Sequence, residues 1–144
     1  MEGQLLEGKY RVVRLIGEGG MGAVYEAEHT LIGRAVAVKV LHGDFAESED
    51  ALERFRREAR AATAIHHPNI IDVTDMGTTA AWRPFLVMEL LEGTPLSALI
   101  GSGRPVPLAR IAGILIQVLD ALDAAHKKGI VQRDLKPDNL FVVQ

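Results

Sequence analysis

The sequence predicts an α+β fold in which a small antiparallel sheet precedes a mainly helical part. The first half is rich in Val, Ile and Ala, is interrupted by glycine, and contains short segments that alternate apolar and polar residues, as strands joined by tight turns do. The second half repeats apolar residues at three- and four-residue steps, the period of an amphipathic helix. Between them, Glu92-Gly93 is expected to form a linker.

Five strands and one helix are expected in the first half. The helix is predicted from about Ser48 to Ile65, because acidic residues at its start and arginines further along suit the helix dipole. His67-Pro68-Asn69 is expected to end it. The strands are predicted over residues 10–16, 23–29, 34–41, 71–76 and 84–90.

Two helices are expected in the second half. Thr94-Pro95 predicts the start of a short one, with a capping hydroxyl followed by proline at the first helical position. A longer helix is predicted from Pro107 to Lys128, with Gly129 as its natural stop. An irregular polar segment, Val131 to Asn139, and a short apolar run, residues 140–143, follow it.

Composition excludes several classes of protein. The 144 residues carry a net charge of −3, without the basic excess of a nucleic-acid binder. The absence of cysteine removes disulfides, thiolate zinc sites and cysteine nucleophiles. The apolar stretch Ile111–Leu119 is too short to span a bilayer, and the N-terminus lacks the regions of a signal peptide, so a cytoplasmic protein is expected. The histidines are interpreted as structural or surface residues, at positions 29, 42, 66, 67 and 126.

A glycine-rich segment from Gly17 to Val24 fits the pattern G-x-G-x-x-G-x-V. In a dinucleotide-binding fold this pattern leads into a helix whose N-terminus holds the pyrophosphate. Here it leads into Val24–Glu28, which alternates like a strand and favours a hairpin flap whose backbone N–H groups approach phosphate oxygens. An ordinary glycine-rich hairpin is the third interpretation.

Lys39 and Glu58 form a candidate pair. On a strand, Ala37 and Lys39 share one face, and a lysine within an apolar strand is costly to bury unless it is paired. Glu58 lies at the border of the apolar stripe of the predicted helix, where it can meet Lys39 across the helix–sheet interface. The alternative is that Glu58 is solvated and Lys39 extends to water.

The loop after the long helix combines an acid, a base and an amide. Asp134 can accept a hydroxyl proton, Lys136 can neutralise a transferred phosphoryl group, and Asn139 can bind Mg²⁺ through its amide oxygen. The alternative is a polar turn built around Pro137.

Six motifs follow one another along the chain: Leu15–Gly22, Val36–Lys39, Phe55–Ala59, His67–Ile70, Leu86–Leu90 and Arg133–Asn139. In this order they resemble the eukaryotic-like serine/threonine protein kinase family, most closely its bacterial members. The resemblance implies a protein-kinase-like fold, with an N-lobe and hinge over residues 1–91 and the start of a helical C-lobe over residues 92–144. The N-lobe would be a five-stranded antiparallel sheet with one helix.

The resemblance also implies an ATP- and Mg²⁺-dependent transfer of phosphate to Ser and Thr hydroxyls of proteins, as in signal transduction. It makes Asp134 the catalytic base and Lys136 its phosphate-neutralising partner. It makes Asn139 a Mg²⁺ ligand and pairs Lys39 with Glu58. The implied ATP-binding positions are Ile16, Gly17, Glu18, Gly19, Gly22, Val24, Ala37, Lys39, the gatekeeper Met88, the hinge residues Glu89 and Leu91, and Leu140.

The sequence departs from the family pattern in two places. Gln132 stands where the family has His, which leaves open a nucleotide-binding pseudokinase or scaffold. The sequence ends at Gln144, before the family's Asp-Phe-Gly segment, so we expect a C-terminally truncated domain that is inactive on its own. The apolar face of the long helix is then expected to be exposed and to favour self-association. The resemblance to bacterial members also leaves open a membrane anchor in a full-length form.

Overall fold

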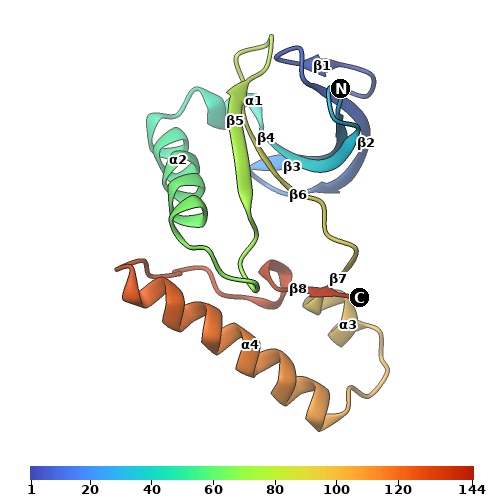
Figure 1. Cartoon of the computed structure of the whole chain (residues 1–144), viewed down its shortest axis with the longest axis vertical. Coiled ribbons are helices and arrows are strands. Elements are labelled where there is room, and N and C mark those ends of the chain that lie inside the picture. The colour runs from blue at the N-terminus through green and yellow to red at the C-terminus, as the bar shows by residue number, and fades with distance from the viewer. The chain divides into compact units, whose positions relative to one another are not determined.

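A computed structural model describes all residues from Met1 to Gln144 as two compact units (Figure 1). The first unit comprises Met1–Ala64 and Ile71–Leu90, and the second comprises Ile65–Ile70 and Leu91–Gln144. The chain thus passes from the first unit to the second between Leu90 and Leu91. The division into lobes at residue 91 stays a prediction. In addition, the segment after the predicted helix belongs to the second unit, where Asn69 Nδ2 donates to Gln117 Oε1 at 2.9 Å.

The first unit is built on a six-stranded antiparallel sheet with the order β1-β2-β3-β4-β6-β5. Its five main strands follow the predicted ones, and β1 adds two residues at one edge. The strands are β1 (Leu5–Leu6), β2 (Tyr10–Glu18), β3 (Gly22–His29), β4 (Arg34–Leu41), β5 (Val73–Thr78) and β6 (Pro84–Glu89).

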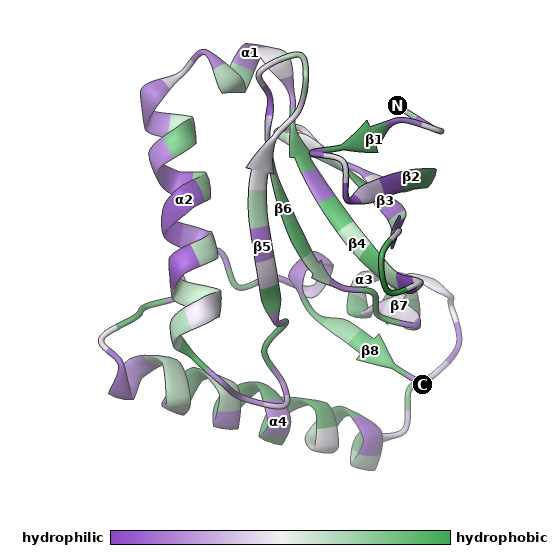
Figure 2. Ribbon diagram, turned by 45° about the horizontal axis from the view of Figure 1, so that its top comes forward, coloured by the Kyte–Doolittle hydropathy of each residue, from purple (hydrophilic) through white to green (hydrophobic).

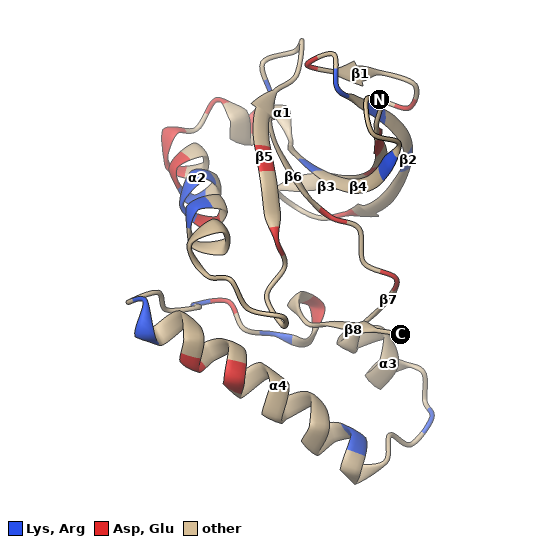
Figure 3. Ribbon diagram, viewed as in Figure 1, with Lys and Arg blue, Asp and Glu red and all other residues tan.

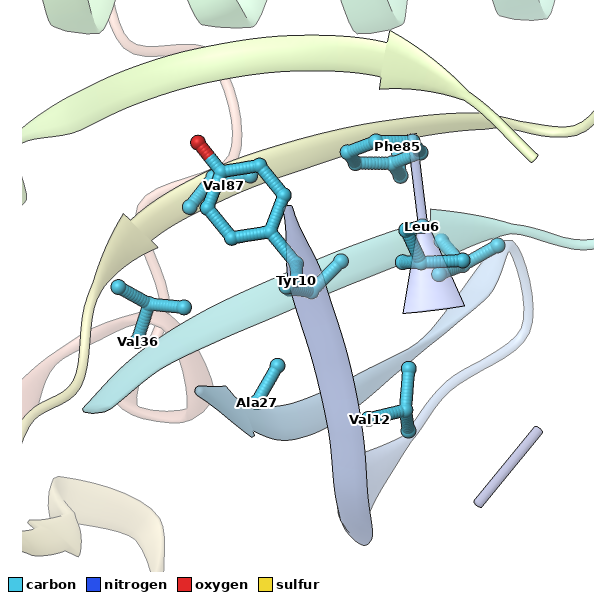
Figure 4. Close-up of a cluster of buried hydrophobic side chains, with 9 residues drawn as sticks. Leu6, Tyr10, Val12, Ala27, Val36, Phe85 and Val87 are labelled. Atoms are coloured by element: carbon cyan, nitrogen blue, oxygen red, sulfur yellow. The ribbon is translucent and has the colours of Figure 1, made fainter. Parts of the chain in front are cut away.

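One face of this sheet carries the main apolar core. Alternate residues of β4 point into it, and Val38, Phe85 and Val87 are wholly buried there. Figure 4 shows Tyr10 and Phe85 among these side chains, with their rings edge-to-face at a centroid distance of 6.4 Å. The core consists of Leu6, Tyr10, Val12, Ala27, Val36, Val38, Val40, Phe85 and Val87.

A second apolar cluster joins the other face of the sheet to helix α2 (Glu49–Ala64), which runs beside β5 (Figure 2). Phe55 and Ala59 of the helix pack against Leu41 and Leu86 of the sheet. The Ser48 hydroxyl accepts the Ala51 N–H at 3.3 Å, which caps the helix where the sequence predicts its start. A four-residue helix, α1 (Gly43–Ala46), precedes it.

The second unit contains the helices α3 (Leu96–Gly101) and α4 (Leu108–Lys127), the 3-10 turn η1 (Pro137–Asn139), and the strands β7 (Gly93–Pro95) and β8 (Phe141–Val143). The two short strands pair antiparallel. Among the residues of α4 only Ala125 is buried, so its apolar face is exposed as expected. Neither α4 nor any other helix is both long and apolar enough to cross a membrane.

Three local predictions are wrong. Thr94-Pro95 does not start a helix: both residues lie in β7, and Pro95 precedes α3 without a side-chain cap. Gly93 is likewise part of a strand rather than a linker, because it pairs with Val143. The fourth predicted strand begins two residues later, at Val73, because its pairing with β6 sets the register.

Candidate active site

The residues singled out in the sequence fall into two groups, one on each unit. The glycine loop, Lys39, Glu58 and the apolar positions around them belong to the first unit. Asp134, Lys136, Asn139 and Leu140 belong to the second.

The glycine loop joins β2 to β3 and forms the tip of a hairpin. Gly17 pairs with Val24 and Glu18 with Ala23, and the Gly19 N–H donates to the Gly22 carbonyl at 2.9 Å. A strand rather than a helix follows the loop, which removes the dinucleotide-binding interpretation. Only glycine fits at position 22, because a Cβ there would overlap the carbonyl oxygen of Val40.

Lys39 and Glu58 are brought together by β4 and α2. Lys39 Nζ lies 3.6 Å from Glu58 Oε2, with the two side chains 35% and 66% exposed. An ion pair this exposed adds little to stability, so its effect is to direct the ammonium group. The alternative, in which Glu58 is solvated and Lys39 extends to water alone, does not fit, because the two charged groups lie within ion-pair distance.

Three apolar positions share the face of the sheet that carries Lys39. Val24 is directly opposite Lys39 in the β3–β4 ladder, and Ala37 is directly opposite Met88 in the β4–β6 ladder. Ala37 is buried, whereas Val24 and Met88 are partly exposed. Because cross-strand neighbours project to the same side, these residues form one apolar surface beside the lysine.

The remaining nucleotide positions lie at the ends of elements. Ile16 and Glu18 are exposed near the end of β2, and Glu89 ends β6. The backbone N–H of Leu91 donates to no other group of the chain and is free to bind a ligand. Leu140 lies between η1 and β8, and its carbonyl accepts the Leu96 N–H at 2.7 Å.

The loop after α4 gathers its three polar residues around Asp134. Lys136 Nζ lies 3.5 Å from Asp134 Oδ2. Asn139 Nδ2 donates to the Asp134 carbonyl at 2.8 Å and to Asp134 Oδ2 at 3.3 Å. Since the amide nitrogen is engaged with Asp134, Oδ1 is the atom of Asn139 left to bind a cation. The polar-turn interpretation also holds, because η1 begins at Pro137, but the turn places these groups together.

Gln132 occupies the position that departs from the family motif. Its side-chain Oε1 accepts the Asp134 N–H at 3.3 Å, so the glutamine supports the backbone of the residue that carries the carboxylate.

The site residues of the first unit fit a nucleotide phosphate, and those of the second unit fit Mg²⁺. The glycine loop is open at Gly20, where an added Cβ would meet no atom within 4 Å, and an ammonium group directed by a carboxylate suits phosphate oxygens. Mg²⁺ takes oxygen ligands and is usually held by one or two protein groups together with substrate phosphates, which suits Asn139 Oδ1.

Comparison with known proteins assigns the chain to a family. Residues 10–144 match the protein kinase domain family, and the chain belongs to that family. It is similar to the serine/threonine-protein kinase Pkn1 of Myxococcus xanthus, at 51% identity over 137 residues, 95% of this chain and 19% of that protein. It is also similar to PrkC of Bacillus subtilis, at 38% identity over 140 residues, 97% of this chain and 22% of that protein.

Solved structures agree with the fold. The kinase domain of Mycobacterium tuberculosis PknI superposes with a TM-score of 0.84 at 30% identity, covering 99% of this chain and 58% of that one. The predicted protein-kinase-like fold is therefore confirmed. The chain spans about a fifth of the length of the curated relatives named above.

Sequence reasoning missed one contact at the site. His42, interpreted as a structural or surface residue, directly follows β4 and hydrogen-bonds to the glycine loop. Its spacing from the loop gives no signal, because the contact depends on how β3 and β4 pair.

Proposed function

We propose that the protein carrying this chain is an ATP-dependent serine/threonine protein kinase. The observation that carries the proposal is the cluster around Asp134, in which Lys136 and Asn139 both contact the carboxylate. The Lys39–Glu58 pair supports it from the first unit. A protein that served only as a scaffold would not need both the cluster around Asp134 and the Lys39–Glu58 pair.

The reaction follows from the chemistry of these side chains. MgATP supplies the phosphoryl group and the cation that offsets its charge. Lys39, directed by Glu58, binds phosphate oxygens of the nucleotide, and Asn139 Oδ1 holds the cation. Asp134 accepts the proton of a Ser or Thr hydroxyl as its oxygen bonds to the γ-phosphorus, and the bond to the β-phosphate oxygen breaks to release ADP. Lys136 neutralises the transferred group.

The test compares two aspartates of the same loop. With radiolabelled ATP and the full-length protein, Asp134→Asn should reduce transfer by about 10²- to 10⁴-fold, the usual contribution of a general base. Asp138→Asn, in η1, is the matched control and should keep most of the activity. Equal activity of Asp134→Asn and the wild type would reject the proposed role of the carboxylate.

A nucleotide-binding pseudokinase is the alternative, and Gln132 in place of the family's His favours it. In that case the wild-type protein binds ATP without transferring phosphate, and Gln132→His creates or strongly increases activity. The hydrogen bond from the Asp134 N–H to Gln132 argues for retained activity, since the loop keeps a support at this position.

The 144-residue chain expressed alone is proposed to bind nucleotide weakly and to transfer no phosphate. Phosphoryl transfer depends on positioning and electrostatics, and the sequence contains no Asp-Phe-Gly segment to supply a second metal ligand.

A further inference from the structure

The tip of the glycine loop is held by the residue that follows β4. The tip consists of Gly19, Gly20 and Met21, between β2 and β3. The His42 N–H donates to the Met21 carbonyl at 2.9 Å, and His42 Nε2 lies 3.1 Å from the Gly19 carbonyl oxygen. His42 therefore binds both the first and the last residue of the tip.

The two bonds differ in what they require of the side chain. Any residue except proline can supply the backbone N–H to Met21. The bond to Gly19 needs a side-chain donor, because a carbonyl oxygen only accepts. His42 Nε2 therefore carries a proton, and this nitrogen bears one in the Nε2–H neutral tautomer and in the imidazolium alike.

The bond to Gly19 fixes the direction of the next N–H group. In a trans peptide, the carbonyl of Gly19 and the N–H of Gly20 lie in one plane and point in opposite directions. Holding the carbonyl against His42 thus turns the Gly20 N–H away from it. That N–H donates to no other group of the chain, so it is free for a ligand.

Without this bond the peptide group between Gly19 and Gly20 would be free to reorient, although the Gly19 N–H and the Met21 carbonyl keep their backbone partners. Glycine reaches more backbone conformations than other residues, and Gly19 and Gly20 are adjacent. Glu18 Oε1 lies 3.9 Å from the same imidazole nitrogen, on the strand that enters the tip, and adds an attraction when the ring is charged.

We propose that His42 is a positioning residue for the nucleotide phosphates. Its imidazole holds the Gly19 carbonyl and thereby presents the Gly20 N–H to a phosphate oxygen. The inference rests on the proposed function, because it names a further residue of the same nucleotide site.

The test separates phosphate binding from adenosine binding. Dissociation constants for adenosine, MgADP and MgATP are measured by calorimetry on the purified full-length protein, together with KM for ATP and kcat. The variants are His42→Ala, His42→Leu, which keeps the bulk without a donor, and His42→Gln, which retains a terminal N–H. The control is His66→Ala, an exposed histidine in the second unit.

His42→Ala and His42→Leu should weaken MgADP and MgATP binding by about 3- to 10-fold, the effect of losing one hydrogen bond, and leave adenosine binding unchanged. KM for ATP should rise by a similar factor, with a smaller change in kcat. His42→Gln should recover most of the affinity, and His66→Ala should match the wild type.

Two results would overturn the inference alone. One is wild-type affinity for all three ligands in both His42→Ala and His42→Leu. The other is an equal loss of adenosine and ATP binding, which would show that His42 only maintains the fold. A wild-type protein that binds no MgATP would instead reject the proposed function, and this inference with it.

Discussion

At the scale of single residues, the ion pair of Lys39 and Glu58 is expected to affect ATP binding more than the stability of the fold. Both side chains reach solvent, so the pair is screened, and removing it should change the free energy of unfolding by less than about 1 kcal/mol. In the proposed function, the pair directs one ammonium group to a phosphate, where a charge-assisted hydrogen bond is stronger.

Lys39→Met should therefore weaken ATP binding by about 10- to 100-fold without lowering the melting temperature appreciably. Glu58→Gln should act in the same direction but less strongly, because the lysine remains and only its orientation is lost. Calorimetric binding and thermal unfolding, measured on the same samples, check both statements.

Glu53→Gln is the matched control for Glu58→Gln. Glu53 lies on the same helix and pairs with Arg57 at 3.5 Å, so its replacement removes a more exposed ion pair of the same helix. If it weakens ATP binding as much as Glu58→Gln does, the pair with Lys39 has no special role.

Replacing Gly22 is expected to lower the stability of the fold. An alanine Cβ would overlap the Val40 carbonyl oxygen and lie 3.2 Å from the carbonyl carbon, both of them backbone atoms that cannot rotate away. Gly22→Ala should lower the free energy of unfolding by about 1–3 kcal/mol, as overpacking does. Gly20→Ala, with no atom within 4 Å of its Cβ, should show little loss in the same denaturation experiment; equal losses would contradict this account.

At the scale of elements, a hydrogen bond joins two strands that are far apart in the sheet order. Tyr10 of β2 donates its hydroxyl to Asp75 Oδ2 of β5 at 2.6 Å, and Lys9 Nζ lies 3.6 Å from the same oxygen. Burial, followed by the bond to Asp75, raises the pKa of Tyr10 to about 12. The bond from Tyr10 is the main cause that lowers the pKa of Asp75.

The contribution of the Tyr10–Asp75 hydrogen bond to the free energy of unfolding should decrease at both high and low pH. A raised folded-state pKa means that the Tyr10 contribution is complete below its ordinary value of 10.0 and is lost as the pH rises toward about 12. A lowered folded-state pKa means that the Asp75 contribution is present above 3.8 and is lost below it.

Tyr10→Phe should accordingly cost about 1–2 kcal/mol at neutral pH, and the gap to the wild type should narrow above pH 10 and in strong acid. Urea unfolding at several pH values measures this. Tyr25→Phe, whose hydroxyl makes no hydrogen bond in the structure, is the control and should cost less. A gap for Tyr10→Phe that stays constant from acid to alkaline pH would disprove the linkage.

Elements with a clear period were predictable from the sequence, and short or long-range ones were not. The apolar stripe of α2 and the alternation along β4 place Phe55, Lys39 and Glu58 correctly. By contrast, β1 has two residues and α1 four, too few to show a period. Strand β7 forms because Gly93–Pro95 pairs with Phe141–Val143. The two segments are far apart in the sequence, so no local pattern predicts their pairing.

The same distinction holds for the candidate site. Motif spacing in the sequence alone identifies Lys39, Glu58, Asp134, Lys136 and Asn139 as candidates. His42 is not found in this way, because its bond to Gly19 exists only when β3 and β4 are paired and the tip folds back.

At the scale of the whole molecule, the exposed apolar face of α4 is expected to determine whether the isolated chain self-associates. Ile116 and Leu119 are 66% and 63% exposed, and no charged residue lies between Arg110 and Asp120 (Figure 3). An apolar helix face of this kind favours association.

The isolated 144-residue chain should therefore self-associate with rising concentration in size-exclusion chromatography with light scattering. The double variant Ile116→Lys/Leu119→Lys should reduce the mass toward that of a monomer. Ile100→Lys, at an apolar position on α3 that is 58% exposed, should not reduce the mass. A wild-type chain that stays monomeric at high concentration would refute the expectation.

The central claim is that this protein moves phosphate from ATP to hydroxyl groups of proteins. The most direct measurement is to incubate the full-length protein with γ-labelled ATP and Mg²⁺, hydrolyse the products, and identify the labelled amino acids. We expect phosphoserine and phosphothreonine in the wild type and neither in Lys39→Met. ATP binding by the wild type without any labelled amino acid would contradict the claim and favour the pseudokinase.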